Sequence, residues 1–205
     1  MLAEYGHPVS IVTKSALVER DLDLIGPMAE RGLAQVTISL TSLDRELSRR
    51  LEPRAAAPER RLRTIEGLRA RGIPTGVLLA PVIPGLNEDE LERLLDAAGN
   101  VGALSAGYVL LRLPLEVSAL FEDWLQRHYP LRAKRVLSHL RQMRGGRDND
   151  PHFGSRVRGQ GVWAALLARR FELARRRLGL ARSLPPLDTG AFRAPGAHQG
   201  QLSLF

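Results

Sequence analysis

The sequence predicts an α/β protein built on a parallel β-sheet of about four strands. Between residues 9 and 113, short apolar runs alternate with segments of helical periodicity, which is typical of repeated strand–helix–strand units. A sheet of this kind is either open and doubly wound or part of a TIM-like (β/α) barrel. After residue 114 only helical patterns follow, so we expect a sheet region over 1–114 and a helical extension over 115–182.

Local signals set the order of the elements. Strands are predicted at 9–15, 34–42, 76–83 and 107–113, and helices at 16–30, 58–71, 87–98, 116–128, 130–144 and 160–178. Pro58 begins one helix and Gly72 ends it. Asn87, followed by three acidic residues, is predicted to cap the next. Because four strands are few and the first begins near residue 9, we expect a half-barrel that lacks its first units.

Residues 72–88 join a fully buried strand to a loop that exposes its backbone. The apolar run from Val77 to Ala80 is typical of a parallel strand covered on both faces. Pro81, Pro84 and Gly85 follow this run, and proline cannot donate to a sheet ladder. We therefore expect the strand to end at the prolines and to offer free carbonyl groups to a ligand.

Function in parallel α/β folds gathers at the carboxyl ends of the strands, so Lys14, Ser39, Thr41 and Ala80 are expected on one rim. Lys14 suits a carboxylate or phosphate, although a lysine here is also typical of a solvated edge. The hydroxyls of Ser39 and Thr41 are either ligand-binding groups or ordinary strand residues. Tyr108 is interpreted as core, with a hydrogen-atom relay as the alternative.

Four short segments carry a resemblance to a known family. They are TKS at 13–15, TISLTS at 37–42, LEPR at 51–54 and GVLLAPVIPG at 76–85. Together they resemble the later part of a radical SAM enzyme core, of the branch related to spore photoproduct lyase, over about residues 7–113. The resemblance implies a partial TIM-like barrel in which Lys14 and Ser39 bind the amino-acid carboxylate of S-adenosylmethionine. It further implies that the Ala80 backbone contacts the adenine. Arg54, in the loop above the rim, is a weaker candidate for the same site.

The sequence departs from that family because it contains no cysteine. The family's [4Fe–4S] cluster is held by three closely spaced cysteines in an earlier strand loop, so this chain cannot ligate the cluster itself. His7, His128 and His139 show no metal-ligand spacing either. We expect the chain to contribute the second half of a cofactor site, as a fragment, a chain with a mispredicted start or a degenerate paralogue.

Positive charge is concentrated in the carboxyl-terminal third. Residues 1–125 carry 14 basic and 18 acidic side chains, and residues 126–205 carry 16 and 4, which gives −4 against +12. Such asymmetry favours contact with DNA or RNA, although arginines also solvate helix faces. His152 and Phe153 lie in a Gly-rich loop that is either a base-contacting site or a self-satisfied turn. The predicted nucleic-acid contacts around it are Arg144, Arg147, Arg156 and Arg158.

The chain ends in QLSLF after a stretch from residue 183 rich in Pro, Gly, Ala and Ser, which predicts a flexible tail over 183–205. The pentapeptide resembles the motif that docks on the bacterial DNA sliding clamp. The resemblance implies that three apolar side chains lie in a groove of the clamp and that a side-chain amide forms a hydrogen bond at the mouth of this groove. The corresponding residues are Gln201, Leu202, Leu204 and Phe205. The alternative is an apolar terminus that folds back over the barrel.

Our leading interpretation is a truncated radical SAM-type half-barrel. Its full-length parent would cleave S-adenosylmethionine reductively at a [4Fe–4S] cluster and act on DNA or another nucleic acid. The first alternative is a non-catalytic, clamp-tethered nucleic-acid-binding module. The second is a complete α/β enzyme with a phosphate-bearing substrate, which the lack of a Gly-rich phosphate loop disfavours. No apolar run reaches about 18 residues, so we expect a soluble cytoplasmic protein without a membrane span.

Overall fold

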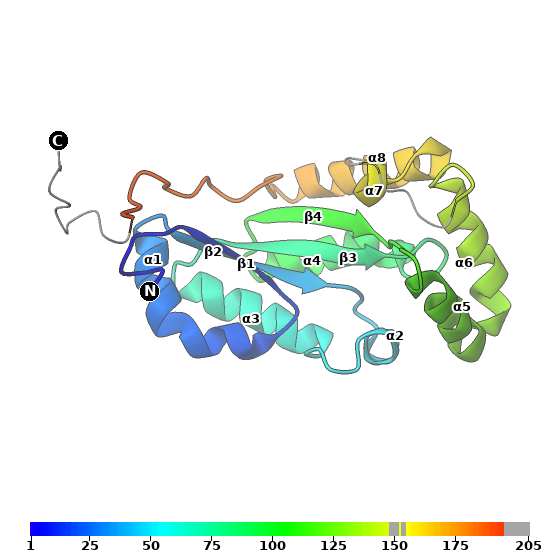
Figure 1. The fold of residues 1–205 in the computed structure, drawn as a ribbon, viewed down its shortest axis with the longest axis horizontal. Coiled ribbons are helices and arrows are strands. Elements are labelled where there is room, and N and C mark those ends of the chain that lie inside the picture. The colour runs from blue at the N-terminus through cyan, green and yellow to red at the C-terminus, as the bar shows by residue number, and fades with distance from the viewer. Residues whose placement is uncertain (148–151, 153–154, 195–205) are drawn as a thin grey trace, which may run out of the picture.

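The computed structural model describes residues 1–147, 152 and 155–194. Four parallel strands form one sheet in the order β1-β2-β3-β4. Their bounds are β1 Val9–Thr13, β2 Ala34–Leu40, β3 Thr75–Val82 and β4 Ser105–Leu110. All three pairings are parallel, so the predicted α/β class with a four-stranded parallel sheet is confirmed (Figure 1).

Helices connect the strands and then continue the chain. Those between strands are η1 Ala16–Asp21, α1 Leu22–Glu30, α2 Arg45–Leu51, α3 Pro58–Ala70, η2 Glu88–Glu90 and α4 Leu91–Asn100. Those after the sheet are α5 Val117–His128, α6 Pro130–Gln142, α7 Ser155–Arg158 and α8 Gly161–Arg177. None of the described helices is both long enough and apolar enough to cross a membrane.

The two faces of the sheet differ in chemistry. Ile38 pairs with Val77 and Leu40 with Leu79 in the β2–β3 register, and all four are at most 1% exposed beneath the helices. Full burial of such a side chain stabilises the fold by about 1.5–3 kcal/mol. The opposite face carries Ser39 and its neighbours. Side chains of α8 pack into the same core as the sheet, so the helical extension is not separate from it.

A second apolar cluster lies where the strands end. It joins the loops after β3 and β4 to α5 and α6, and its buried members are Ile83, Leu113, Phe121, Leu125, Ala133, Val136, Leu137 and Leu140. Gly85 permits this close approach, because its φ is +75° and an added Cβ would lie 3.5 Å from Val136 Cγ2. The helix pair is therefore fixed at the carboxyl end of the sheet.

Residues 183–194 cross the amino ends of all four strands, and we call them the strap (Figure 1). Ala181 forms a parallel bridge with Ser105, at the start of β4, just before the strap begins. Further along, Asp188 N donates to Gly32 O at 2.9 Å. Arg193 N donates to Tyr5 O at 2.8 Å. The flexible tail expected from residue 183 is thus held against the sheet in its first part.

Two expectations about β3 need correction. The strand does not end at Pro81, because it continues to Val82, which pairs with Leu110 beyond an irregularity in the register; it does end before Pro84, in agreement with the predicted bounds of 76–83. Asn87 is not a side-chain N-cap. Its Oδ1, the atom that would cap the helix, accepts from Ile83 N instead, and its Nδ2 donates to two backbone carbonyls around the end of β3.

Candidate functional site

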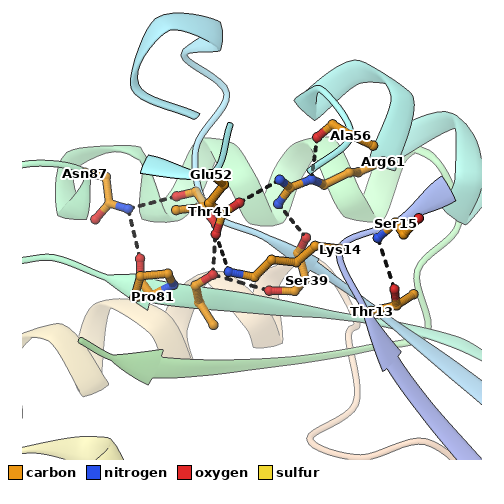
Figure 2. Close-up of polar contacts among 11 residues, drawn as sticks. Thr13, Lys14, Ser15, Ser39, Thr41, Glu52, Ala56, Arg61, Pro81 and Asn87 are labelled. Atoms are coloured by element: carbon orange, nitrogen blue, oxygen red, sulfur yellow. Dashed lines mark hydrogen bonds and ion pairs between the residues drawn. The ribbon is translucent and has the colours of Figure 1, made fainter. Parts of the chain in front are cut away.

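The predicted rim residues meet in one polar cluster at the carboxyl ends of the strands (Figure 2). Lys14 follows β1, Ser39 lies near the end of β2, and Ala80 lies in β3. Ser39 Oγ donates to Ala80 O at 3.3 Å, and Thr41 Oγ1 lies 2.8 Å from the same carbonyl. The parallel register thus gathers groups from three strands, as the sequence predicts.

Glu52 is the centre of this cluster, which we call the rim cluster. It follows α2 as the residue that caps its carboxyl end. Its carboxylate forms an ion pair with the Lys14 ammonium, lies 2.8 Å from Thr41 Oγ1 and accepts from Arg61 Nη2 at 2.6 Å. Two cations and a hydroxyl therefore surround one carboxylate.

Arg61 anchors the cluster from below. Its side chain is 1% exposed, and a buried charge is tolerated only when it is paired and hydrogen-bonded. The guanidinium meets this condition, because Nη1 donates to Ser39 O at 3.0 Å and Nε donates to Ala56 O at 2.7 Å. Arg61 thus ties α3 to the end of β2 and to the loop after Glu52.

The pKa of Glu52 lies below its ordinary value. Burial is the largest single influence and raises this pKa, but the hydrogen bonds from Lys14, Arg61 and Thr41 and the positive charge of Lys14 together lower it by more. The carboxyl is therefore ionised at neutral pH. It is a fixed negative charge that orients the ammonium beside it.

The hydroxyl of Thr41 has one proton and two acceptors at the same distance. Glu52 Oε1 and Ala80 O each lie 2.8 Å from Thr41 Oγ1, and a hydroxyl donates only once. The 3.3 Å contact of Ser39 Oγ with Ala80 O is long for a hydroxyl donor. The Ser39 proton is consequently weakly held and can turn to another acceptor.

Asn87 fixes the loop above the cluster. Its Nδ2 donates to Thr41 O at 2.8 Å and to Pro81 O at 3.0 Å, while its Oδ1 accepts from Ile83 N at 2.6 Å. The residue is 3% exposed. The carbonyls expected to be free for a ligand at the end of β3 are therefore already bonded inside the chain, to hydroxyls and to this amide.

Lys14 is the group of the rim cluster that a ligand can reach. Its side chain is 39% exposed, whereas that of Glu52 is 9% and that of Arg61 is 1%. An ammonium has three donors, so Lys14 can keep Glu52 and still bind an incoming anion. Ser39 is 3% exposed, so an incoming carboxylate meets the ammonium first.

Other predicted residues occupy different places. Tyr108 pairs with Leu79 and so lies on the helix-covered face, opposite Ser39, where its ring packs against Phe171 at 4.8 Å. The interpretation of Tyr108 as a core residue is therefore confirmed. Arg54 is exposed in the loop after Glu52.

The four predicted nucleic-acid contacts separate in the structure. Arg144 is 4% exposed and donates to the carbonyls of Leu111 and Arg156, so it holds two loops together. This burial does not fit the predicted contact with a nucleic acid. Arg147 and Arg158 are exposed, and the Arg158 guanidinium lies 4.5 Å from the Tyr108 ring centroid. Phe153 and the predicted clamp-binding residues 201–205 lie outside the described residues.

The sequence reasoning missed Glu52, Arg61 and the loop role of Asn87. Arg61 carries a usable signal, because it falls at helical spacing with buried Ile65 and Leu68 on the apolar face of α3. A charged residue on such a face needs a buried partner. Glu52 lies in the LEPR segment at 51–54, but that segment does not indicate its partners, since Glu52 reaches the rim only through the fold.

The fold and the rim cluster define a partial parallel (β/α) barrel with a charged carboxyl rim. Residues 1–98 match the family model of the radical SAM superfamily. A mutant of spore photoproduct lyase has a similar structure, with a TM-score of 0.60 and 15% sequence identity over 88% of this chain and 53% of that one. Residues 1–98 are therefore similar to the radical SAM superfamily, and the solved structure shows a shared fold.

Curated relatives of this chain are longer than the chain itself. Uncharacterized proteins of Mycobacterium tuberculosis and Mycobacterium bovis are 37% identical over 131 residues, which is 63% of this chain and 38% of theirs. An uncharacterized protein of Methanocaldococcus jannaschii is 28% identical over 122 residues, 60% of this chain and 44% of its own. The chain thus spans well under half the length of these relatives.

Proposed function

We propose that this chain supplies the carboxylate-binding part of an S-adenosylmethionine site in a radical SAM-type half-barrel. The observation that carries the proposal is the convergence of Lys14 and Ser39, with the Ala80 carbonyl, on one rim. The ammonium and the hydroxyl would hold the amino-acid carboxylate of the cofactor. Glu52 would orient Lys14, and Arg61 would hold Glu52 in place.

The two cofactors of the family fit this chain differently. A carboxylate suits the exposed Lys14 ammonium and the weakly engaged Ser39 hydroxyl. A [4Fe–4S] cluster does not fit, because the sequence has no cysteine, and the described residues form no group of three or more potential metal ligands. The cluster ligands, and with them the reductive cleavage of S-adenosylmethionine, would have to come from a longer parent or another chain.

Calorimetric titration with S-adenosylmethionine and with methylthioadenosine, which lacks the carboxylate, tests the proposal. The wild-type chain should prefer S-adenosylmethionine. Lys14→Ala should weaken its binding by about 10- to 150-fold, since a hydrogen bond to a charged group contributes about 1.5–3 kcal/mol. The same variant should bind methylthioadenosine as the wild type does, because that ligand makes no contact with the ammonium.

Lys134→Ala is the matched control, because Lys134 is the other lysine of the chain and lies on α6. It should leave both affinities unchanged. Equal affinity of Lys14→Ala and the wild type for S-adenosylmethionine would remove Lys14 from the site.

We further propose that the parent acts on DNA or another nucleic acid and is recruited through the terminal pentapeptide to a sliding clamp. The basic residues 126–205 and the residues Gln201, Leu202, Leu204 and Phe205 support this part of the proposal. A non-catalytic, clamp-tethered nucleic-acid-binding module is the second candidate. The absence of cysteine favours it, and both candidates share the same nucleic-acid contact.

A further inference from the structure

The outer surface of α6 carries positive charge without acidic neighbours in sequence. Residues 124–147 contain no Asp or Glu, and α6 lies within this stretch. Arg132, Lys134 and Arg135 are exposed along its first half. Within the described part of the chain, no ion pair or side-chain hydrogen bond joins any of the three to another residue.

Four of the five arginines of α8 differ, because each forms an ion pair with an acidic side chain. Arg170 Nη2 lies 2.7 Å from Glu92, and Arg177 Nη2 lies 2.9 Å from Asp96, so both arginines tie α8 to α4. The carboxylate of Glu172 accepts from a further set, namely Arg175, Arg176 and Arg182. By contrast, Arg132, Lys134 and Arg135 of α6 have no acidic partner within the described part of the chain.

This helix lies at the same end of the sheet as the rim cluster. Figure 1 shows α5 and α6 beyond the ends toward which the strands point. Gly85, in the loop after β3, approaches Val136 of α6. Trp124 Nε1 of α5 donates to Arg50 O of α2 at 3.0 Å, and Glu52 follows α2 directly. α6 therefore lies at the carboxyl end of the sheet, with its buried side, which carries Val136, against the loop after β3.

A groove of about 600 Å³ runs along the exposed side of α6. Its lining includes hydrogen-bond donors at helical spacing, Lys134, Ser138 and Arg141, with Gln126 of α5. Glu122 of α5 also lines it. Ammonium, guanidinium and hydroxyl groups in a row are the donors that contact successive phosphates of a nucleic-acid backbone.

We infer that the outer face of α6, with Arg132, Lys134 and Arg135 as its main cations, binds the phosphate backbone of a nucleic acid. The inference rests on the proposed action on nucleic acid and names the surface that performs the contact. Binding through phosphates is independent of sequence and strongly dependent on salt. The surface holds the strand at the carboxyl end of the sheet and leaves base recognition to other groups.

Fluorescence anisotropy with a short labelled DNA duplex, measured without S-adenosylmethionine over a series of salt concentrations, tests the inference. The perturbation is the triple variant R132Q/K134Q/R135Q in the full 205-residue chain. Each lost phosphate contact lowers the slope of log K against log salt by about 0.9, so the three together lower it by about 2.7. Between 50 and 200 mM salt, wild-type affinity should therefore fall roughly 40-fold more than that of the variant.

The matched control is R169Q/R176Q/R177Q on α8, which removes the same charge from exposed positions. Circular dichroism would establish that both variants are folded. An unchanged slope in the α6 variant, an equal loss in the α8 variant, or no DNA binding by the folded wild type would each overturn the inference. Equally tight binding of labelled polyglutamate would also overturn it, in favour of an acidic protein partner. None of these readouts depends on Lys14, so failure here and failure of cofactor binding are distinguishable.

Discussion

Glu52→Gln is the substitution that separates the two cations of the rim cluster. It keeps the size of the side chain and removes the negative charge that holds Lys14 and Arg61. Lys14 is 39% exposed and regains water when the pair is broken, whereas Arg61 is 1% exposed and loses its carboxylate inside the protein. The loss of stability should therefore come almost entirely from Arg61.

The size of the effect follows from this difference in burial. Removing one partner of a buried ion pair costs about 3–5 kcal/mol, and an exposed pair contributes about 0–1 kcal/mol. Arg61 keeps carbonyl acceptors at 3.0 Å on Ser39 and 2.7 Å on Ala56, which favours the low end of the range. We expect Glu52→Gln to lower the free energy of unfolding by about 3 kcal/mol, and Lys14→Met by less than about 1 kcal/mol.

The same variant makes a prediction about pH. The folded-state pKa of Glu52 lies below its ordinary value of 4.5, despite the burial that raises it. A carboxyl of this kind binds fewer protons folded than unfolded. Its stabilising contribution is fully present above pH 4.5 and is lost as the pH falls through the folded-state pKa. The difference in stability between wild type and Glu52→Gln should therefore shrink in acid.

Urea denaturation followed by circular dichroism and tryptophan fluorescence, from neutral pH into the acid range, measures both effects. Glu46→Gln is the matched control, because Glu46 pairs with Arg50 one helical turn away and is 60% exposed. It should cost no more than about 0.5 kcal/mol. A loss below about 1 kcal/mol for Glu52→Gln, or a difference from wild type that stays constant with pH, would refute the central place of Glu52.

Two further predictions concern the ends of the chain. Gly6→Ala should release the strap, because the added Cβ would lie 2.4 Å from Ala191 O at a φ of +62°, and trypsin should then cut after Arg193 faster than in wild type. Gly26→Ala, with open space around its Cβ, should leave that rate unchanged; equal rates in all three proteins would contradict the strap. Deleting residues 201–205 should abolish binding to a sliding clamp in surface plasmon resonance, whereas retained binding would exclude the pentapeptide as the docking motif.

The sheet and its rim were predictable because their signals are local. Apolar runs mark the strands, and parallel pairing brings strand ends together, so the meeting of Lys14, Ser39 and Ala80 follows from chain order. Burial at Ile38 and Leu40 likewise follows from alternation along β2. These features depend on residues a few positions apart, which a sequence pattern records directly.

The rest depends on pairings between distant segments. Glu52 and Lys14 are 38 positions apart, and Asn87 reaches Thr41 across 46, so no local pattern encodes either contact. Asn87 was expected to cap its own helix, but its side chain binds backbone groups near the ends of β2 and β3 instead. Composition predicted a flexible tail where the strap lies. The strap is instead held by two backbone hydrogen bonds to loops, and the composition of a segment does not record such bonds.

The strap also determines where a mechanical load on the carboxyl terminus enters the molecule. A pull transmitted along the chain reaches the bonds to Tyr5 and Gly32 before it reaches α8. These bonds join the strap to the segments that lead into β1 and β2. A load on the carboxyl terminus therefore enters the sheet at the amino ends of β1 and β2, opposite the carboxyl rim.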